Sequence, residues 1–457
     1  MERLTPSDMA MLLSEDYGWP QDIGALAILD SHELLDGDRM RLDEIRAHVG
    51  SRLHLVPRFR QLLLRPRLGL GGPLWVDAPE VDLAHHVRVR PVDPPGDEEQ
   101  LLEVCEELRR RPFATDRPRW EMWLLPGLAD RSIGLYVRVH HAAADGMAGM
   151  AALAAFVDTS TEIAAIRDRD PRVPDPLPSA GDLLRDNLTR RAHRLISMLG
   201  SLAHPLCLAR RVWSELKVMG RVFRAVKAPA SSLNQRVGPR RRMALIRGDL
   251  EAHREIAHSR SSTVNDLLLA ITARGLRDLV ASRGEGTPDM VLRAMVPVSL
   301  HGTGDTEPNG NSDAGMIIPL PPFGERDPAR ALGLIAAATA EGKKVRQPSM
   351  GTGIFRLPWV QRLGLRLVTR QRLGNVYVAN VPGPPFPLYL MGARIRELFP
   401  VVPIMGNMTV GIGALSYAGQ FNLTLVADAD ACPDLDVLAD GMRRGITEFS
   451  GLAASVG

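Results

Sequence analysis

The chain reads IGLYVRVHHAAADG from Ile133 to Gly146. The first seven of these residues are mainly apolar and include two valines and a tyrosine, as is typical of a buried β-strand. The strand ends at the pair His140 and His141, and the residues from Met147 onward have the spacing of a helix. A strand that delivers two imidazoles to a loop in front of a helix indicates an α/β protein with a functional site at the strand end.

The histidine pair has the chemistry of a general base. A neutral imidazole, whose pKa is ordinarily about 6.5, can accept a proton from a hydroxyl group, which typically accelerates a reaction by ~10² to 10⁴. Asp145 can cap the following helix and orient the loop, and Gly146 lets the backbone turn close to a ligand. The candidate catalytic residues are therefore His141, His140, Asp145 and Gly146.

Composition limits the class of protein. Hydrophobic residues make up 45% of the chain and charged residues 24%, a balance typical of globular proteins. The 457 residues exceed the roughly 250 to 300 that one hydrophobic core organises, so we expect two lobes. The formal net charge is only +3, so a charged partner must be recognised by a local patch, and no nucleic acid is expected.

The cysteines and the N-terminal residues indicate the compartment. Cys105, Cys207 and Cys432 lie far apart and predict neither a disulfide framework nor a metal site. The N-terminal residues lack the apolar run of a secretory signal, and no stretch reaches the ~20 apolar residues of a membrane span. We therefore expect a cytoplasmic protein without a metal or another cofactor. A second pair, at 85–86, is not followed by Asp-Gly and is interpreted as structural.

The chain is predicted to have three regions. Residues 1–165 alternate helical patterns with short strands and form the N-terminal lobe, which carries the histidine pair. Residues 166–235 form a linker and a basic amphipathic connector, and residues 236–457 form the C-terminal lobe. The clearest elements of the second lobe are a helix over 262–283 and strands over 291–300 and 375–380.

The connector carries basic side chains interleaved with Leu, Ile, Met, Trp and Val. These are Arg190, Arg191, Arg194, Arg210, Arg211, Lys217, Arg221 and Arg224. The pattern fits either a helix that bridges the lobes with a solvated arginine face, or an amphipathic helix that docks on anionic lipid or phosphate groups.

Short segments follow one another along the chain in a specific order. Before the histidine pair they are Leu4–Asp8, Val56–Arg60, Pro73–Trp75 and Arg117–Met122; after it they are Thr263–Asp266, Val296–Ser299, Asn380–Pro384 and Ser416–Gly419. With the HHxxxDG motif, they resemble the bacterial wax ester synthase/diacylglycerol acyltransferase family over nearly the whole chain. Ala142, Ala143 and Ala144 replace the bulkier apolar residues usual in that family, which puts the acceptor preference in doubt.

The resemblance implies a fold and an activity. The fold would be α/β, two-lobed and chloramphenicol-acetyltransferase-like, with the active-site tunnel between the lobes. The enzyme would move a long-chain acyl group from acyl-CoA to the hydroxyl of a diacylglycerol or a long-chain alcohol, with His141 as general base. Because such acceptors are insoluble, the protein would work at the inner membrane face or at lipid droplets, attached peripherally.

The resemblance also implies further site residues. The candidates for substrate binding are Asn265, Asn380, Ser299 and Trp75. The first three are also candidate hydrogen-bond donors to the oxyanion. An alternative places Asn265 simply in the first turn of its helix, with Ser262 or Thr263 as the cap. Arg60 lies in a segment similar to the arginine motif of condensation domains and is expected to pair with Asp145 as a structural residue.

Three other functions fit parts of the sequence. His140 and Asp145 have the His-x₄-Asp spacing of glycerol-phosphate acyltransferases, but the chain lacks that family's phosphate-binding segment. The same fold also serves transfer or condensation of an acyl group from a carrier-protein thioester. A non-catalytic lipid-binding paralogue is the third alternative, and the intact histidine motif argues against it.

Overall fold

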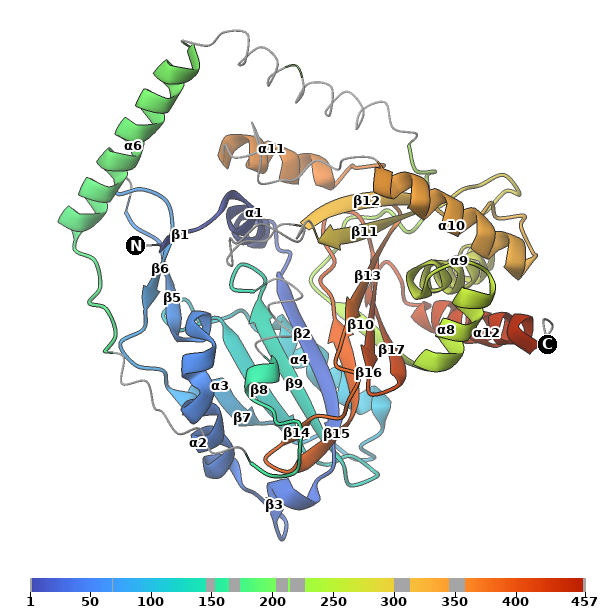
Figure 1. The fold of residues 1–457 in the computed structure, drawn as a ribbon, viewed down its shortest axis with the longest axis horizontal. Helices are drawn as coiled ribbons and strands as arrows, with labels where there is room; N and C mark the ends of the chain where they lie inside the picture. The colour runs from blue at the N-terminus through green and yellow to red at the C-terminus, as the bar shows by residue number, and fades with distance from the viewer. Residues whose placement is uncertain are drawn as a thin grey trace.

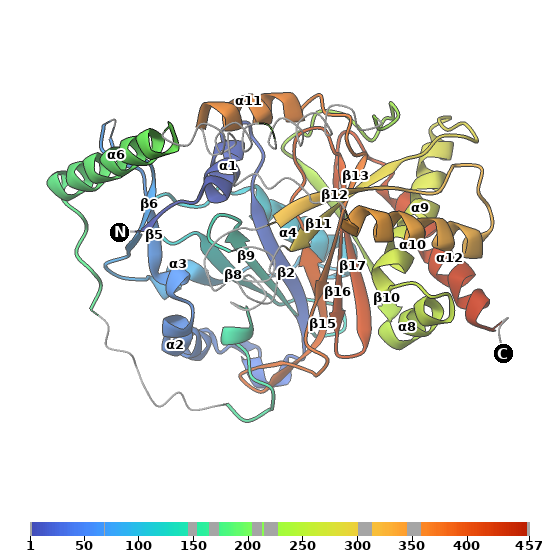
Figure 2. The same ribbon diagram turned by 45° about the horizontal axis from the view of Figure 1, so that its top comes forward.

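The computed structural model describes residues 2–67, 69–144, 153–163, 173–202, 213, 227–299, 313–344 and 358–454. Two six-stranded sheets dominate it and stand side by side (Figures 1 and 2). The first has the order β14-β15-β2-β9-β8-β7 and the second the order β10-β17-β16-β13-β11-β12.

The first sheet is built mainly from the N-terminal part of the chain. Its strands are β2 (Asp22–Leu29), β7 (Val87–Val89), β8 (Trp120–Leu125), β9 (Ile133–His140), β14 (Tyr389–Leu390) and β15 (Ala393–Val401). Every residue of β9 is buried, because β9 is an inner strand that is covered on both faces. A strand buried on both faces needs a nearly continuous apolar run, so the predicted strand before the histidine pair is confirmed.

The second sheet carries helices on its outer side (Figure 1). Its strands are β10 (Arg241–Asp249), β11 (Arg293–Ser299), β12 (Asp313–Pro319), β13 (Val376–Pro382), β16 (Val410–Tyr417) and β17 (Gln420–Asp428). The helices are α8 (Leu250–Ser259), α9 (Val264–Ser282), α10 (Pro328–Lys344) and α12 (Leu435–Ala454). The predicted helix and both predicted strands of the second lobe are confirmed by α9, β11 and β13.

Smaller elements complete the fold. The helices are α1 (Pro6–Glu15), α2 (Leu42–Arg52), α3 (Leu83–His86), α4 (Glu98–Arg110), α6 (Ala180–Leu202) and α11 (Pro358–Val368). The short strands are β1 (Glu2–Arg3), β3 (Leu35–Asp36), β4 (Arg39–Met40), β5 (Gln61–Leu64) and β6 (Leu74–Asp77). The 3-10 turns are η1 (His32–Leu34), η2 (Leu53–Leu55) and η3 (Pro57–Arg60).

The first sheet borrows strands from the C-terminal part of the chain. β15 pairs antiparallel with β2, for example Phe399 with Leu26. Beyond β15 the chain runs close to β16, where a Cβ atom on Gly413 would lie only 2.9 Å from the Val402 side chain. Glycine permits this close approach. The predicted division at residues 165 and 235 stays a prediction, but the first sheet is not made from the first lobe's sequence alone.

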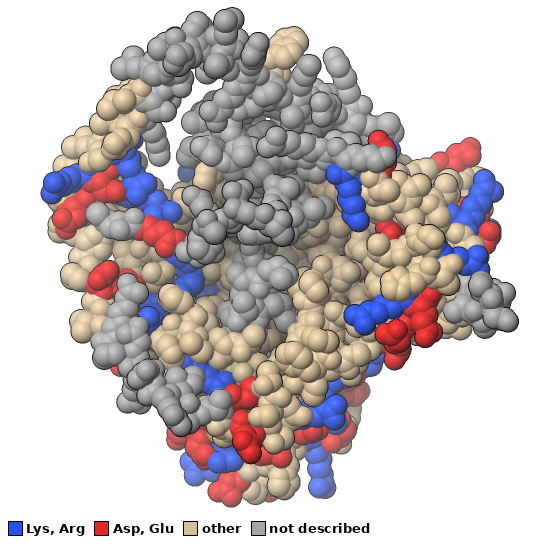
Figure 3. Space-filling model, in the orientation of Figure 1, with Lys and Arg blue, Asp and Glu red and all other residues tan. Residues whose placement is uncertain are grey.

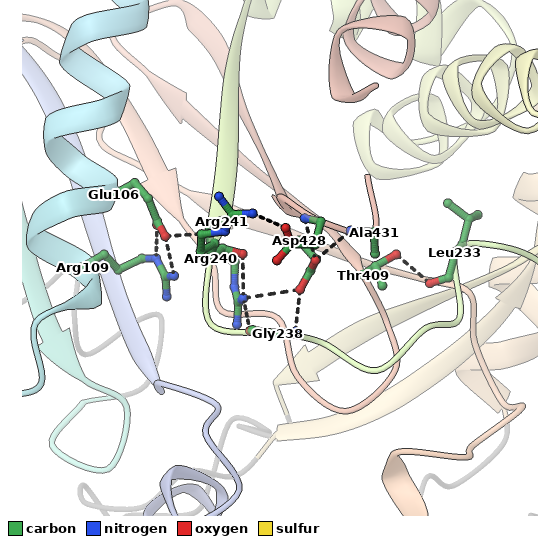
Figure 4. Close-up of polar contacts among 10 residues, drawn as sticks. Glu106, Arg109, Leu233, Gly238, Arg240, Arg241, Thr409, Asp428 and Ala431 are labelled. Atoms are coloured by element: carbon green, nitrogen blue, oxygen red, sulfur yellow. Dashed lines mark hydrogen bonds and ion pairs between the residues drawn. The ribbon is translucent and has the colours of Figure 1, made fainter. Parts of the chain in front are cut away.

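Charged side chains also link α4 to the second sheet (Figure 4). The Glu106 carboxylate on α4 accepts hydrogen bonds from the Arg109 side chain at 2.8 Å and from the backbone N–H of Arg241 at 2.7 Å. The Arg241 guanidinium lies 3.8 Å from Asp428 at the end of β17. Burial lowers the pKa of Arg241 to about 10. Glu106 is thus a link between α4 and the first strand of the second sheet.

The connector is described in part. α6 confirms its helical start, and residues 203–212 and 214–226 lie outside the described residues. In the part of the chain that the structure describes, no helix is long and apolar enough to cross a membrane. The face in Figure 3 shows acidic and basic side chains intermixed, in keeping with the small net charge.

Candidate active site

His140 lies at the end of β9 and is completely buried. Its Nδ1 atom accepts a hydrogen bond from the backbone N–H of Ala142 at 3.0 Å, and its own backbone N–H donates to the Arg119 carbonyl at 3.0 Å. Its Nε2 atom lies 2.9 Å from Oε1 of Glu15. Since Nδ1 is an acceptor, the proton of the neutral ring is on Nε2, facing the carboxylate. Both ring nitrogens of His140 are therefore engaged within the protein.

Glu15 is the last residue of α1. Its Oε1 atom is in close contact with Nε2 of His140, although the geometry is not that of an in-line hydrogen bond. Its other oxygen accepts a hydrogen bond from the Arg119 guanidinium at 3.0 Å, and Arg65 lies 3.9 Å away. Burial raises the pKa of Glu15, but the contacts with His140 and Arg119 together outweigh burial and lower that pKa to about 2. The carboxylate is therefore ionised at neutral pH.

His141 follows directly and has different surroundings. It is half-buried, and its backbone N–H donates to the Gln21 carbonyl at 2.7 Å. The register of β2 and β9 sets Asp22 opposite His140. The turn between α1 and β2 thus holds the backbone of the histidine pair from one side.

Trp75 lies beside the loop that follows the histidines. It is buried in an apolar cluster with Leu12, Leu63 and Ala142, and Arg58 stacks over its ring with 4.5 Å to the centroid. The structure therefore brings Trp75 and the histidine loop together, although its role in substrate binding stays a prediction.

The structure does not describe the Asp-Gly part of the HHxxxDG motif. Asp145 and Gly146 lie outside the described residues, and so does the predicted pair of Arg60 with Asp145. Arg60 ends η3, is half-buried and lines a pocket of about 230 Å³ together with His54 and Asp77. The structural role of Arg60 beside Asp145 stays a prediction.

The remaining candidates belong to the second lobe. Asn265 lies in the first turn of α9, whose N-cap is Thr263 in a capping box with Asp266, so the predicted position and cap are confirmed. Asn380 lies near the end of β13 and is half-buried. Ser299 ends β11, and its side chain is outside the description. Substrate binding by these three residues stays a prediction.

Glu15 was not among the residues predicted from the sequence. Sequence patterns do not pair an acid near the N-terminus with a histidine at the end of a distant strand. One local signal was present: α1 ends at Glu15 with Asp16 as its C-cap, and its last turn has no basic residue. Acids at a helix C-terminus oppose the helix dipole, and such a broken local rule often marks a functional position.

His86 of the other histidine pair packs in the core, whereas His85 is half-buried. His86 is buried, stacks on Trp120 with 4.4 Å between ring centroids, and its Nδ1 lies 2.8 Å from the Trp120 carbonyl oxygen. Burial lowers the pKa of His86 to about 4. These contacts agree with the structural interpretation. Within the described ranges, no group of three His, Cys, Asp or Glu residues could hold a metal ion.

Two solved structures share this fold. The wax ester synthase/diacylglycerol acyltransferase from Marinobacter aquaeolei VT8 matches with a TM-score of 0.68 at 23% identity, covering 99% of this chain and all of the other. A variant of the starter condensation domain of rhizomide synthetase, solved with C8-CoA, matches with a TM-score of 0.62 at 16% identity, covering 99% and 95%. The predicted two-lobed α/β fold of the chloramphenicol-acetyltransferase type is therefore confirmed.

The sequence defines the family within that fold. The model of the wax ester synthase/diacylglycerol acyltransferase catalytic domain matches residues 4–268, and that of the C-terminal domain matches residues 309–450. The chain belongs to this acyltransferase family. A putative diacylglycerol O-acyltransferase of Mycobacterium bovis and a probable one of Mycobacterium tuberculosis are each 29% identical to it, over 98% of this chain and 96% of theirs.

Proposed function

We propose that this protein moves a long-chain acyl group from acyl-CoA to a lipid hydroxyl, with His141 as general base. The acceptor would be a diacylglycerol, a long-chain alcohol or both, giving triacylglycerol or wax ester. The observation that carries the assignment of the base is the enclosure of His140, whose two nitrogens face Ala142 and Glu15. His141 is half-buried just beyond the strand, and we assign it as the imidazole of the pair that meets the substrate.

The chemistry needs one imidazole and no covalent enzyme intermediate. His141 removes the proton of the acceptor hydroxyl, and the oxygen attacks the thioester carbon of acyl-CoA. The oxyanion that forms needs donors about 2.7 to 3.1 Å away, for which Asn265, Asn380 and Ser299 are the candidates. When the carbon–sulfur bond breaks, the imidazolium returns its proton to the departing CoA thiolate.

The relatives support the choice of substrates. The mycobacterial relatives are named diacylglycerol O-acyltransferases, and the rhizomide synthetase domain was solved with C8-CoA. The likeness to a condensation domain also favours a second candidate, in which the donor is an acyl group on a carrier protein. Both candidates use the same base but differ in the group that carries the thioester.

A donor and acceptor panel tests this function. Purified protein is given palmitoyl-CoA with diacylglycerol, hexadecanol or a short soluble alcohol, while free thiol and the ester product are measured. We expect thiol release that depends on the acceptor and matches the ester formed. Ester formation only from a palmitoyl carrier protein would establish the second candidate. Tight binding of palmitoyl-CoA without turnover would establish a non-catalytic lipid-binding protein.

The proposed acceptors are insoluble in water, which supports a peripheral location of the protein on a membrane or lipid droplet. On the described part of α6, Leu184, Leu188, Leu195 and Ile196 are 45 to 65% exposed. Arg190 and Arg191 lie exposed between them in the sequence. Exposed apolar and cationic side chains on one helix suit an anionic lipid surface. The protein would be held on the cytoplasmic face by this helix and the rest of the connector.

A further inference from the structure

We propose that Glu15 is a positioning residue, which locks His140 in one tautomer and thereby fixes the backbone turn that presents His141. The proposal rests on the proposed role of His141 as base. It assigns a part in acyl transfer to a residue outside the HHxxxDG motif.

A continuous line of contacts runs around His141. Arg119 donates to Glu15 at 3.0 Å, Glu15 faces Nε2 of His140 at 2.9 Å, and Nδ1 of His140 accepts from the N–H of Ala142 at 3.0 Å. His141 lies between His140 and Ala142, so the ring of one neighbour is bonded to the backbone of the other. The direction in which the backbone presents His141 is therefore set by this ring-to-backbone bond.

The turn at His141 depends on the tautomer of the His140 ring. The bond from Ala142 exists only while Nδ1 of His140 carries no proton. In the other tautomer, an Nδ1–H would face the Ala142 N–H, two donors would meet, and the turn would open. An ionised carboxylate beside Nε2 favours the tautomer with its proton on Nε2. Glu15 therefore selects the tautomer on which the turn depends.

Both close partners of the Glu15 carboxylate, His140 and Arg119, are buried. The side chain of His140 is 0% exposed and that of Arg119 is 5% exposed. Without the Glu15 carboxylate, the Nε2–H of His140 and the Arg119 cation would lose a partner in a place that water hardly reaches, which is unfavourable. The turn after α1, through Gly18 with φ of +80°, brings Glu15 over the end of β9.

A matched pair of carboxylates makes the proposal testable. Glu121 on β8 is more buried than the half-buried Glu15, and it too pairs with a buried arginine, Arg138, at 2.9 Å. Its carboxylate accepts hydrogen bonds from Arg88, Trp123 and Arg138, none of which belongs to the histidine pair. The experiment changes Glu15 and Glu121 each to Gln and to Ala, and measures kcat, KM for palmitoyl-CoA, KM for the acceptor, and the melting temperature.

We expect Glu15→Ala to lower kcat by about 10²-fold, the loss that follows when a reacting group is misplaced by ~1 Å. Both KM values should change little. Glu15→Gln keeps an oxygen acceptor and should recover most of kcat. The Glu121 variants should lose melting temperature to a similar extent but keep kcat within about threefold, because they leave the histidine turn alone.

Two results would overturn the proposal: a Glu15→Ala enzyme with the kcat of wild type, or Glu121 variants that lose kcat in parallel with those of Glu15 at equal melting temperature. Failure of the proposed function looks different. In that case wild type itself releases no thiol, or His141→Ala retains its turnover whatever residue stands at position 15.

Discussion

His140 and His141 share a peptide bond but occupy different environments. One ring is enclosed by Glu15 and the Ala142 backbone, whereas the other belongs to a half-buried residue beyond the strand. We expect His141→Ala to lower acyl transfer by ~10² to 10⁴ without loss of folding, because it removes the proposed base. His140→Ala should damage turnover less when compared at equal stability. An inactive His140→Ala beside an active His141→Ala would favour the glycerol-phosphate-acyltransferase interpretation.

Glu15 also makes stability depend on pH. Its pKa is lowered to about 2 from an ordinary 4.5. The stabilisation that the ionised carboxylate gives the folded state is therefore complete above pH 4.5 and is lost as the pH falls through about 2. A shift of this size corresponds to roughly 3 kcal/mol. The free energy of unfolding of wild type minus that of Glu15→Gln, from urea titrations, should therefore be largest near neutral pH and shrink below pH 4.5. A difference that stays constant down to pH 3 would contradict this.

Regular elements were the predictable part of the molecule. β9, α9, β11 and β13 were expected because apolar spacing, caps and turn residues act over a few neighbouring positions. The pairing of β15 with β2 was not expected, since nothing in either strand's own pattern specifies a partner from the other lobe. The contact of Glu15 with His140 was missed for the same reason, so the sequence predicted the histidines but not what holds them.

The prediction about lipid binding concerns α6 and the remainder of the connector. Each basic side chain near an anionic surface contributes about 1 kcal/mol, and this attraction weakens as the Debye length falls from about 10 Å at 0.1 M to about 3 Å at 1 M salt. The variant changes Arg190, Arg191, Arg194, Arg210 and Arg211 to Gln. We expect it to leave anionic vesicles at low salt, measured by co-sedimentation, and to keep its turnover of a short soluble alcohol.

A control for this experiment carries as many Arg→Gln changes on the second lobe. Suitable exposed positions are Arg242, Arg254, Arg330, Arg443 and Arg444. The control should bind vesicles as wild type does. If it and the connector variant bind equally well, the connector is an ordinary bridge between the lobes.

At the scale of the whole molecule, Glu106 links α4, which packs against the first sheet, to β10 of the second sheet. Glu106→Ala would leave the cation of Arg109, whose side chain is 5% exposed, and the N–H of Arg241 without their partner. We expect a loss of about 3 to 5 kcal/mol in the free energy of unfolding, as when a buried ion pair loses one member. Glu107 is the matched control, because it pairs with arginines at the surface, where such pairs contribute about 0 to 1 kcal/mol. Equal midpoints of urea unfolding for the two variants would argue against the link.

The strand borrowed from the C-terminal part of the chain has a consequence for synthesis on the ribosome. β2 and β9 are translated early, but β15, which covers the open edge of β2, is finished only at Val401. At roughly 5 to 20 residues per second, that edge waits for tens of seconds. During that time a nascent chain presents unpaired backbone to other chains, a hazard for aggregation. The strand that leads to the histidine pair thus belongs to a sheet that closes only after the chain has been translated to Val401.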